Sequence, residues 1–111
     1  MPISNENRKL FIMAKCSDAP GEAAVKARAE FLGGHLQYVE TILDKVLIAG
    51  PIFGDDKKTV IGSLLIYKTD SQDEARAILE ADPYFNAGIW ESIEFQLFRG
   101  ALGDAVGGKS Y

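Results

Sequence analysis

The amino-acid sequence predicts an α+β domain of the ferredoxin-like βαββαβ type, in which one antiparallel sheet carries both helices on the same face. Short runs of strand-forming residues and two helical segments follow one another in the order strand, helix, strand, strand, helix, strand. A short polar turn joins the two middle strands, which is typical of a hairpin. This order is the split βαβ pattern, and 111 residues suffice for one domain with one core.

The first strand is expected within residues 10–16, a short apolar run rich in strand-forming side chains. Turn-forming residues at 17–21 end this strand and prepare the start of a helix. The polar residues 1–7 are expected to be frayed. The chain is therefore interpreted as a single domain, 1–111, with its core at about 8–99.

The first helix is the most strongly patterned element, and it is expected to end near Asp44 or Lys45. Its apolar residues recur at alternating steps of four and three, which predicts one continuous stripe facing the core. This stripe consists of Val25, Ala29, Leu32, Leu36, Val39 and Leu43. A second stripe beside it consists of Arg28, Phe31, His35, Tyr38 and Ile42. The histidine should therefore lie at the edge of the buried face.

Two consecutive glycines, Gly33 and Gly34, interrupt the middle of this helix. Each glycine costs about 1 kcal/mol relative to alanine in a helix interior. Two explanations are open at this point. Either the helix bears the cost, or a neighbouring group approaches so closely that only a small residue fits.

The second strand begins at Val46 and is expected to stop at Gly50-Pro51, because a proline ends a strand or confines it to the sheet edge. Residues 54–58 form the polar turn of the hairpin, and the third strand covers 59–69. Side chains alternate along this third strand, so one of its faces carries Ile61, Ser63, Leu65 and Tyr67.

The second helix starts around residues 70–74, where acidic side chains suit the positive end of the helix dipole. It is expected to end before Asp82-Pro83, since proline disfavours the helical conformation of the residue that precedes it. The last strand shows a clear alternation over 92–97 and ends near Arg99. The glycine-rich tail, 100–111, is aperiodic and is expected to be loose or to lie on a partner subunit.

Composition excludes several classes of function. A net charge of −4 and an isoelectric point near 4.9 argue against nucleic-acid binding, which needs a basic face. No apolar run is long enough to span a membrane, and the first residues lack the layout of a signal peptide. The single cysteine indicates a reducing, cytoplasmic location. One histidine and one cysteine are too few for a soft-metal site, and no nucleotide-binding glycine spacing occurs, so no cofactor is expected.

A sheet with both helices on one face leaves its second face to be covered by something else. The chain is too short to supply that cover, and the first and third strands are apolar on both faces. A homodimer formed face to face is therefore expected.

His35 and Asp82 are the residues best suited to acid–base chemistry. Imidazole transfers protons near neutral pH, and a carboxylate bonded to it would orient the ring. The plainer interpretations are a hydrogen-bonded structural histidine and an aspartate that bonds backbone amides in a turn. From spacing alone, these plainer interpretations are the more common ones.

Further polar or shape-determining residues are candidates for the wall of a binding site. Ser63 follows Gly62 within a strand, where a glycine indicates close approach of a ligand or of another backbone. Gly50-Pro51 would line a pocket or simply end its strand, and the hydroxyl groups of Tyr38 and Tyr84 would bond a ligand or only reach solvent. Cys16 is interpreted as a buried, unreactive thiol.

Taken in order, these segments resemble the YciI-like (YCII-related) domain family over residues 8–99. The matching segments are the first strand with 18–20, His35-Leu36, Ala49-Gly50-Pro51, Gly62-Ser63, 71–75, 81–84 and Ala87-Gly88. The resemblance implies a dimeric α+β barrel built from ferredoxin-like subunits. It also implies an active site with a His-Asp pair, here His35 and Asp82, lined by Ser63, Tyr84, Gly50 and Pro51.

Many relatives carry an arginine shortly before the histidine, where this chain has Phe31-Leu32-Gly33-Gly34. The nearest arginine is Arg28, two turns back. If the arginine of the relatives holds an anionic substrate, the preference of this chain would differ. The family includes a dehydrochlorinase of a chlorinated hydroxyhydroquinone and shares its fold with muconolactone isomerases.

Three interpretations of function follow. The first is a cofactor-free enzyme for elimination or isomerisation of a small cyclic or aromatic molecule, an anionic one included. The second is a non-catalytic module that binds a small molecule in the same pocket. The third is a structural dimer module, which predicts His35 and Asp82 side chains more than about 6 Å apart, outside hydrogen-bond reach.

Overall fold

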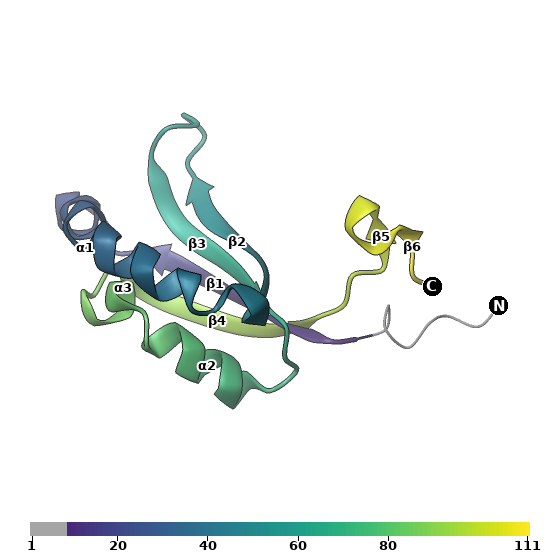
Figure 1. The fold of residues 1–111 in the computed structure, drawn as a ribbon. Helices are drawn as coiled ribbons and strands as arrows, with labels where there is room; N and C mark the ends of the chain where they lie inside the picture. The colour runs from purple at the N-terminus through teal and green to yellow at the C-terminus, as the bar shows by residue number, and fades with distance from the viewer. Residues whose placement is uncertain (1–8) are drawn as a thin grey trace.

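The computed structural model describes residues 9–111 and has the predicted α+β architecture (Figure 1). Four antiparallel strands lie in the order β2-β3-β1-β4, with the helices on one face of the sheet. The strands are β1 (Phe11–Asp18), β2 (Val46–Phe53), β3 (Val60–Tyr67) and β4 (Trp90–Phe98). The frayed segment that the sequence predicts at residues 1–7 lies outside the described residues.

The helices are α1 (Glu22–Glu40), α2 (Gln72–Glu80) and the short α3 (Pro83–Asn86), and a 3-10 turn, η2, covers Leu43–Lys45. Helix α1 ends before Asp44, where the prediction placed its end. The backbone N–H of Thr41 bonds the Tyr38 carbonyl, and the Thr41 hydroxyl donates to the same oxygen at 2.6 Å. The backbone of Ile42 is no longer helical (φ −122°). The apolar pattern of the sequence therefore extends to Ile42 and Leu43, beyond the last residue of the helix.

Helix α1 is also rotated relative to the predicted arrangement. Its main apolar stripe was expected to face the core, yet Val25, Leu32, Leu36 and Leu43 are between 46% and 69% exposed. The second stripe faces the sheet and the other helices instead, except for Phe31, which is 38% exposed. Polar contacts hold it there, because Arg28 bonds Asp18 of β1 and the Tyr38 hydroxyl donates to the Ile78 carbonyl of α2 at 2.6 Å.

The core lies between the sheet and the two longer helices. Alternate residues of β1 are buried against the helices, and α2 contributes its whole apolar side. This cluster consists of Ile12, Ala14, Cys16, Ile42, Leu65, Tyr67, Ala75, Ile78 and Leu79. Helix α2 begins where the sequence predicted, with the Ser71 hydroxyl accepting the Glu74 amide as an N-cap.

The sequence predicts that the second strand stops at Gly50-Pro51. In the structure, β2 instead continues through these two residues to Phe53. Pro51 is opposite Ser63 in the ladder, and β2 is an edge strand. Only an edge strand tolerates a residue without an amide donor in mid-strand, since the missing N–H faces away from the partner. The predicted hairpin with β3 is confirmed.

The tail is folded, which differs from the predicted loose segment. Strands β5 (Leu102–Gly103) and β6 (Gly108–Lys109) pair around η3 (Asp104–Val106), with Gly103 and Gly108 at positive φ. Figure 1 shows this unit, in yellow, standing apart from the body of the molecule. The predicted contact with a partner subunit stays a prediction.

No segment within residues 9–111 covers the sheet face opposite the helices. Phe11, Met13, Leu64 and Ile66 point to this face and are only partly buried, and Ile48 of β2 is 64% exposed. This arrangement is the uncovered second face that the sequence predicts. Separately, no helix among residues 9–111 has the length and apolar character needed to cross a membrane.

Gly33 has no close neighbour that would explain it. A Cβ at this position would meet nothing within 4 Å, whereas one at Gly34 would touch the Pro83 ring at 3.4 Å. We therefore expect Gly33→Ala to raise the free energy of unfolding by about 1 kcal/mol, because alanine removes the entropic cost of glycine in a helix. Urea unfolding at a fixed protein concentration measures this change. A loss of stability would mean that another molecule occupies the space beside Gly33.

Candidate functional site

Asp82 is held in place by the turn that follows it. Because Pro83 comes next, Asp82 adopts an extended conformation (φ −73°, ψ 132°) and becomes the N-cap of α3. The sequence predicted only a turn where this short helix lies. Oδ1 of Asp82 accepts the backbone N–H of Tyr84 at 2.9 Å. The residue is 2% exposed, so its carboxylate is fixed in a buried position.

His35 lies directly against this carboxylate. Its Nδ1 is 2.7 Å from Asp82 Oδ2 and 3.0 Å from Oδ1, far inside the 6 Å limit that a purely structural module predicts. The imidazole also stacks on the Tyr84 ring, with centroids 3.9 Å apart and planes 3° from parallel. Two contacts thus fix the ring. Asp82 contacts Nδ1 of the imidazole and leaves the other ring nitrogen, Nε2, without a bond to this carboxylate.

A second polar cluster adjoins the first. The Arg28 guanidinium makes two hydrogen bonds to Asp18, from Nε at 2.7 Å and from Nη2 at 2.9 Å. Nη2 also donates to Ser63 Oγ at 3.0 Å and to the Gly62 carbonyl at 3.3 Å. Hydrogen bonding to Asp18 raises the pKa of Arg28, so the guanidinium stays charged. Because Oγ accepts from arginine, the Ser63 hydroxyl proton is free to bond another group.

Tyr84 links the two clusters. Its hydroxyl donates to the Arg28 carbonyl at 3.1 Å, and the guanidinium carbon of Arg28 lies 5.4 Å from the centre of its ring. Burial raises the pKa of Tyr84, which keeps the phenol neutral. From the sequence, this hydroxyl was expected either to bond a ligand or to reach solvent, whereas here it donates its proton to the Arg28 carbonyl of α1. Tyr84 therefore acts on the site mainly through its stacking on His35.

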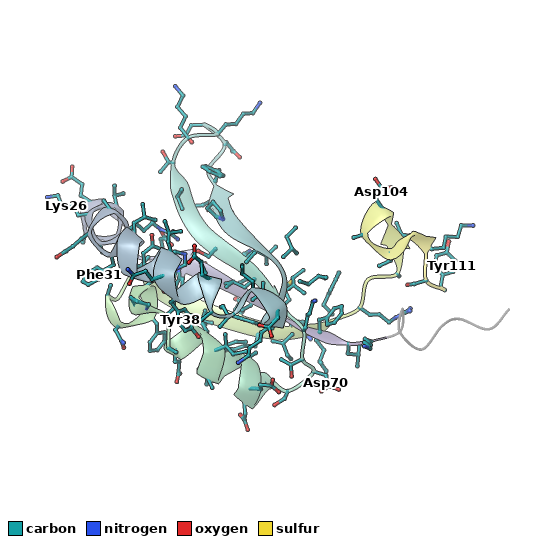
Figure 2. All side chains as sticks on the ribbon, in the orientation of Figure 1. Lys26, Phe31, Tyr38, Asp70, Asp104 and Tyr111 are labelled. Carbon is teal, nitrogen blue, oxygen red and sulfur yellow. The ribbon has the colours of Figure 1, made fainter. Side chains whose placement is uncertain are left out.

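These side chains line a cleft of about 800 Å³ between α1 and the hairpin of β2 and β3. The predicted wall residues all contribute to it, Gly50 and Pro51 from β2 and Ser63 from β3. Figure 2 shows side chains from α1 directed into the space between that helix and the sheet. The structure thus brings the six residues that the sequence singled out to one cleft. These are His35, Asp82, Ser63, Tyr84, Gly50 and Pro51.

Two other sequence candidates have structural explanations. A Cβ on Gly62 would collide with the Cys16 carbonyl oxygen, so the glycine permits close approach of the neighbouring strand and not of a ligand. Cys16 itself is fully buried, and burial raises the pKa of its thiol to about 12. The thiol is therefore neither accessible nor ionised near neutral pH.

Arg28 and Asp18 are the residues that sequence reasoning did not assign to the site. A signal for Arg28 exists, because it precedes His35 by seven residues and so lies on the same side of the helix. Asp18 gives no such signal, since only the packing of α1 on the end of β1 brings it to Arg28. Because no arginine directly precedes the histidine, Arg28 is the one arginine that residues 9–111 contribute to the cleft, and it is already bonded to Asp18.

Comparison with solved structures supports this fold. The chain is 31% identical to 5-chloro-2-hydroxyhydroquinone dehydrochlorinase from Burkholderia phenoliruptrix, solved in complex with 2,5-dihydroxybenzoquinone. That match has a TM-score of 0.63 and covers 86% of this chain and 97% of the enzyme. A nipsnap family protein of unknown function from Agrobacterium tumefaciens is 17% identical, with a TM-score of 0.51 over 90% of this chain and 95% of its own; it indicates the fold alone.

A search among curated proteins found no match. The family comparison, in contrast, is decisive. The model of the YCII-related domain matches residues 10–99, which include both halves of the His35–Asp82 contact and every strand of the four-stranded sheet. The chain therefore belongs to the YCII-related domain family.

Proposed function

We propose that this protein is a cofactor-free acid–base enzyme that acts on a small hydroxylated ring compound by elimination or isomerisation. The observation that carries the proposal is the contact of His35 Nδ1 with the buried carboxylate of Asp82, at 2.7 Å, on the wall of the cleft. A carboxylate that accepts the Nδ1 proton leaves a lone pair on Nε2. That nitrogen is then the general base.

In the proposed reaction, Nε2 of His35 removes a proton from the substrate. In an elimination, the electron pair left behind forms a new double bond and expels a leaving group such as chloride. In an isomerisation, it shifts a double bond, and the proton returns to another ring carbon. The imidazolium that forms is stabilised by Asp82, which keeps its charge throughout. The proton passes afterwards to solvent or back to the substrate.

Ser63 and Arg28 would hold the substrate oxygen. The Ser63 hydroxyl accepts from Arg28 and so can donate its own proton to a phenolate or carbonyl oxygen. The adjacent guanidinium makes the site suitable for an oxygen that gains negative charge as the proton leaves. Its bonds to Asp18 keep it in that position, so it acts mainly through Ser63.

The relationship to the dehydrochlorinase supports this choice of reaction class. That enzyme is 31% identical over most of both chains, and it was solved in complex with a dihydroxylated quinone. A hydroxylated six-membered ring is thus the first substrate class to test. The uncovered sheet face, with Met13 and Ile66 in its centre, supports a homodimer, and the single cysteine supports a cytoplasmic location.

Turnover of a substrate panel tests the proposal. The panel contains chlorinated hydroxyhydroquinones, followed by chloride release, and catechols and lactones, followed by absorbance. We expect turnover of at least one ring compound without added cofactor. The single tryptophan, Trp90, lines the cleft, so its fluorescence reports binding independently. Saturable binding across the panel without turnover would contradict the enzyme and favour a small-molecule-binding module.

A further inference from the structure

The polar groups occupy only one end of the cleft. Arg28 reaches Ser63, which is opposite Pro51 in the ladder, so the polar end lies beside the second half of β2. The remaining wall runs toward the start of β2 and the end of α1 and is aliphatic. It consists of Leu32, Leu36, Val39, Ile42, Leu43, Val46, Leu47 and Ala49.

The cleft as a whole is much larger than a single ring requires. A cavity of about 150 Å³ is enough to hold benzene in a protein interior, whereas this cleft has about 800 Å³. Along β2 it follows the five residues from Pro51 to Leu47, and the four steps between them correspond to about 13 Å. A substrate ring held at Ser63 would leave this length unfilled.

Several of these aliphatic side chains stay exposed, although Val39, Ile42 and Val46 pack into the core. Leu36 is 50% exposed, Leu43 69% and Leu47 44%. Leaving such surface in water is unfavourable by about 25 cal/mol for each Å², so a ligand that covers it gains affinity. The surface is continuous with the His35 and Ser63 groups, which makes it part of the same site.

Two other features of the described part of the chain bear on what could fill the cleft. The uncovered face of the sheet, where a second copy would pack, is on the side opposite the helices and meets the cleft at Ile48 of the edge strand β2. The chain's own tail follows β4, the edge strand farthest from β2. Figure 2 labels Asp104 and Tyr111 in this tail, well away from α1.

We infer that the substrate carries an apolar arm, an alkyl chain or a comparable aliphatic substituent of several carbons, on its hydroxylated ring. The ring would lie between His35 and Ser63, and the arm would cover the leucines of α1 and the first half of β2. This inference rests on the proposed function for the place of the ring. The arm itself is recognised by hydrophobic contact and needs no chemistry.

A homologous series tests the arm. Trp90 fluorescence gives the Kd of hydroquinones with linear substituents from methyl to octyl, each below its micelle concentration. We expect Kd to fall about fourfold for each of the first several methylenes added, the value for burying a CH₂ group. Leu36→Ser should reduce this dependence on chain length. Leu97→Ser is the matched control, because Leu97 is also 50% exposed but lies on β4, outside the cleft.

The outcomes separate this inference from the proposed function. A Kd that does not change with chain length, together with turnover of the unsubstituted ring, would overturn the arm and leave the enzyme intact. A clear chain-length dependence without turnover supports the arm and contradicts catalysis. If Leu36→Ser weakens dimerisation in sedimentation runs and Kd stays flat, a second copy fills the cleft and the inference fails. If Leu36→Ser does not fold, Leu47→Ser is used in its place.

Discussion

Replacing His35 with glutamine is expected to reduce kcat by about 10²- to 10⁴-fold, the usual contribution of a positioned general base. A glutamine amide can still donate a hydrogen bond to Asp82, so the buried carboxylate keeps a partner. It offers no basic nitrogen to the cleft. The loss should therefore appear in kcat, measured with the best compound of the substrate panel, while ligand affinity from Trp90 fluorescence changes only a few-fold.

Two comparisons make this result informative. Gln37→Ala, at an exposed position of the same helix, should leave kcat unchanged. Thermal unfolding of His35→Gln should stay close to that of the unchanged protein, since the mutation removes stacking on Tyr84 but keeps a hydrogen bond to Asp82. If kcat falls less than tenfold, another group is the base. If the variant unfolds instead, His35 has a structural role.

The sequence predicted the fold well because its signals are local. Strand alternation and the polar turn identify β3 and the hairpin, and Ser71 marks the start of α2. Pro83 likewise determines the extended conformation of Asp82, and that is why the backbone conformation of this residue could be predicted from a dipeptide. The edge position of β2 followed from Pro51, although its length did not.

The site was predictable only in part, because side-chain partners depend on packing. Periodicity identified two stripes on α1 but not which one faces the sheet. The more apolar stripe lines the open cleft, and the stripe with Arg28, His35 and Tyr38 is drawn inward by its hydrogen bonds. Asp18 is separated from Arg28 by a turn and part of a helix, and no spacing rule connects them. Such pairs become visible only in three dimensions.

Asp82 provides the sharper test, since asparagine and alanine should fail in different ways. Asparagine preserves the cap, because its side-chain oxygen can accept the Tyr84 amide as the carboxylate does at 2.9 Å. Its NH₂ group then faces His35 and forces Nδ1 to accept, so the ring proton moves to Nε2. The base is lost although every residue stays in place. We expect kcat to fall about 10²- to 10⁴-fold, with little change in Tm.

Alanine removes the cap and the partner of His35 together. Loss of an N-cap costs about 0.5–2 kcal/mol, so Asp82→Ala should be the less stable variant in urea unfolding. Its imidazole, however, is free to place the lone pair on Nε2 for part of the time, so its kcat should exceed that of Asp82→Asn. This crossed order, with asparagine worse for catalysis and alanine worse for stability, distinguishes a tautomer-setting carboxylate from a mere helix cap. A cap alone predicts that Asp82→Asn is as active as the unchanged protein.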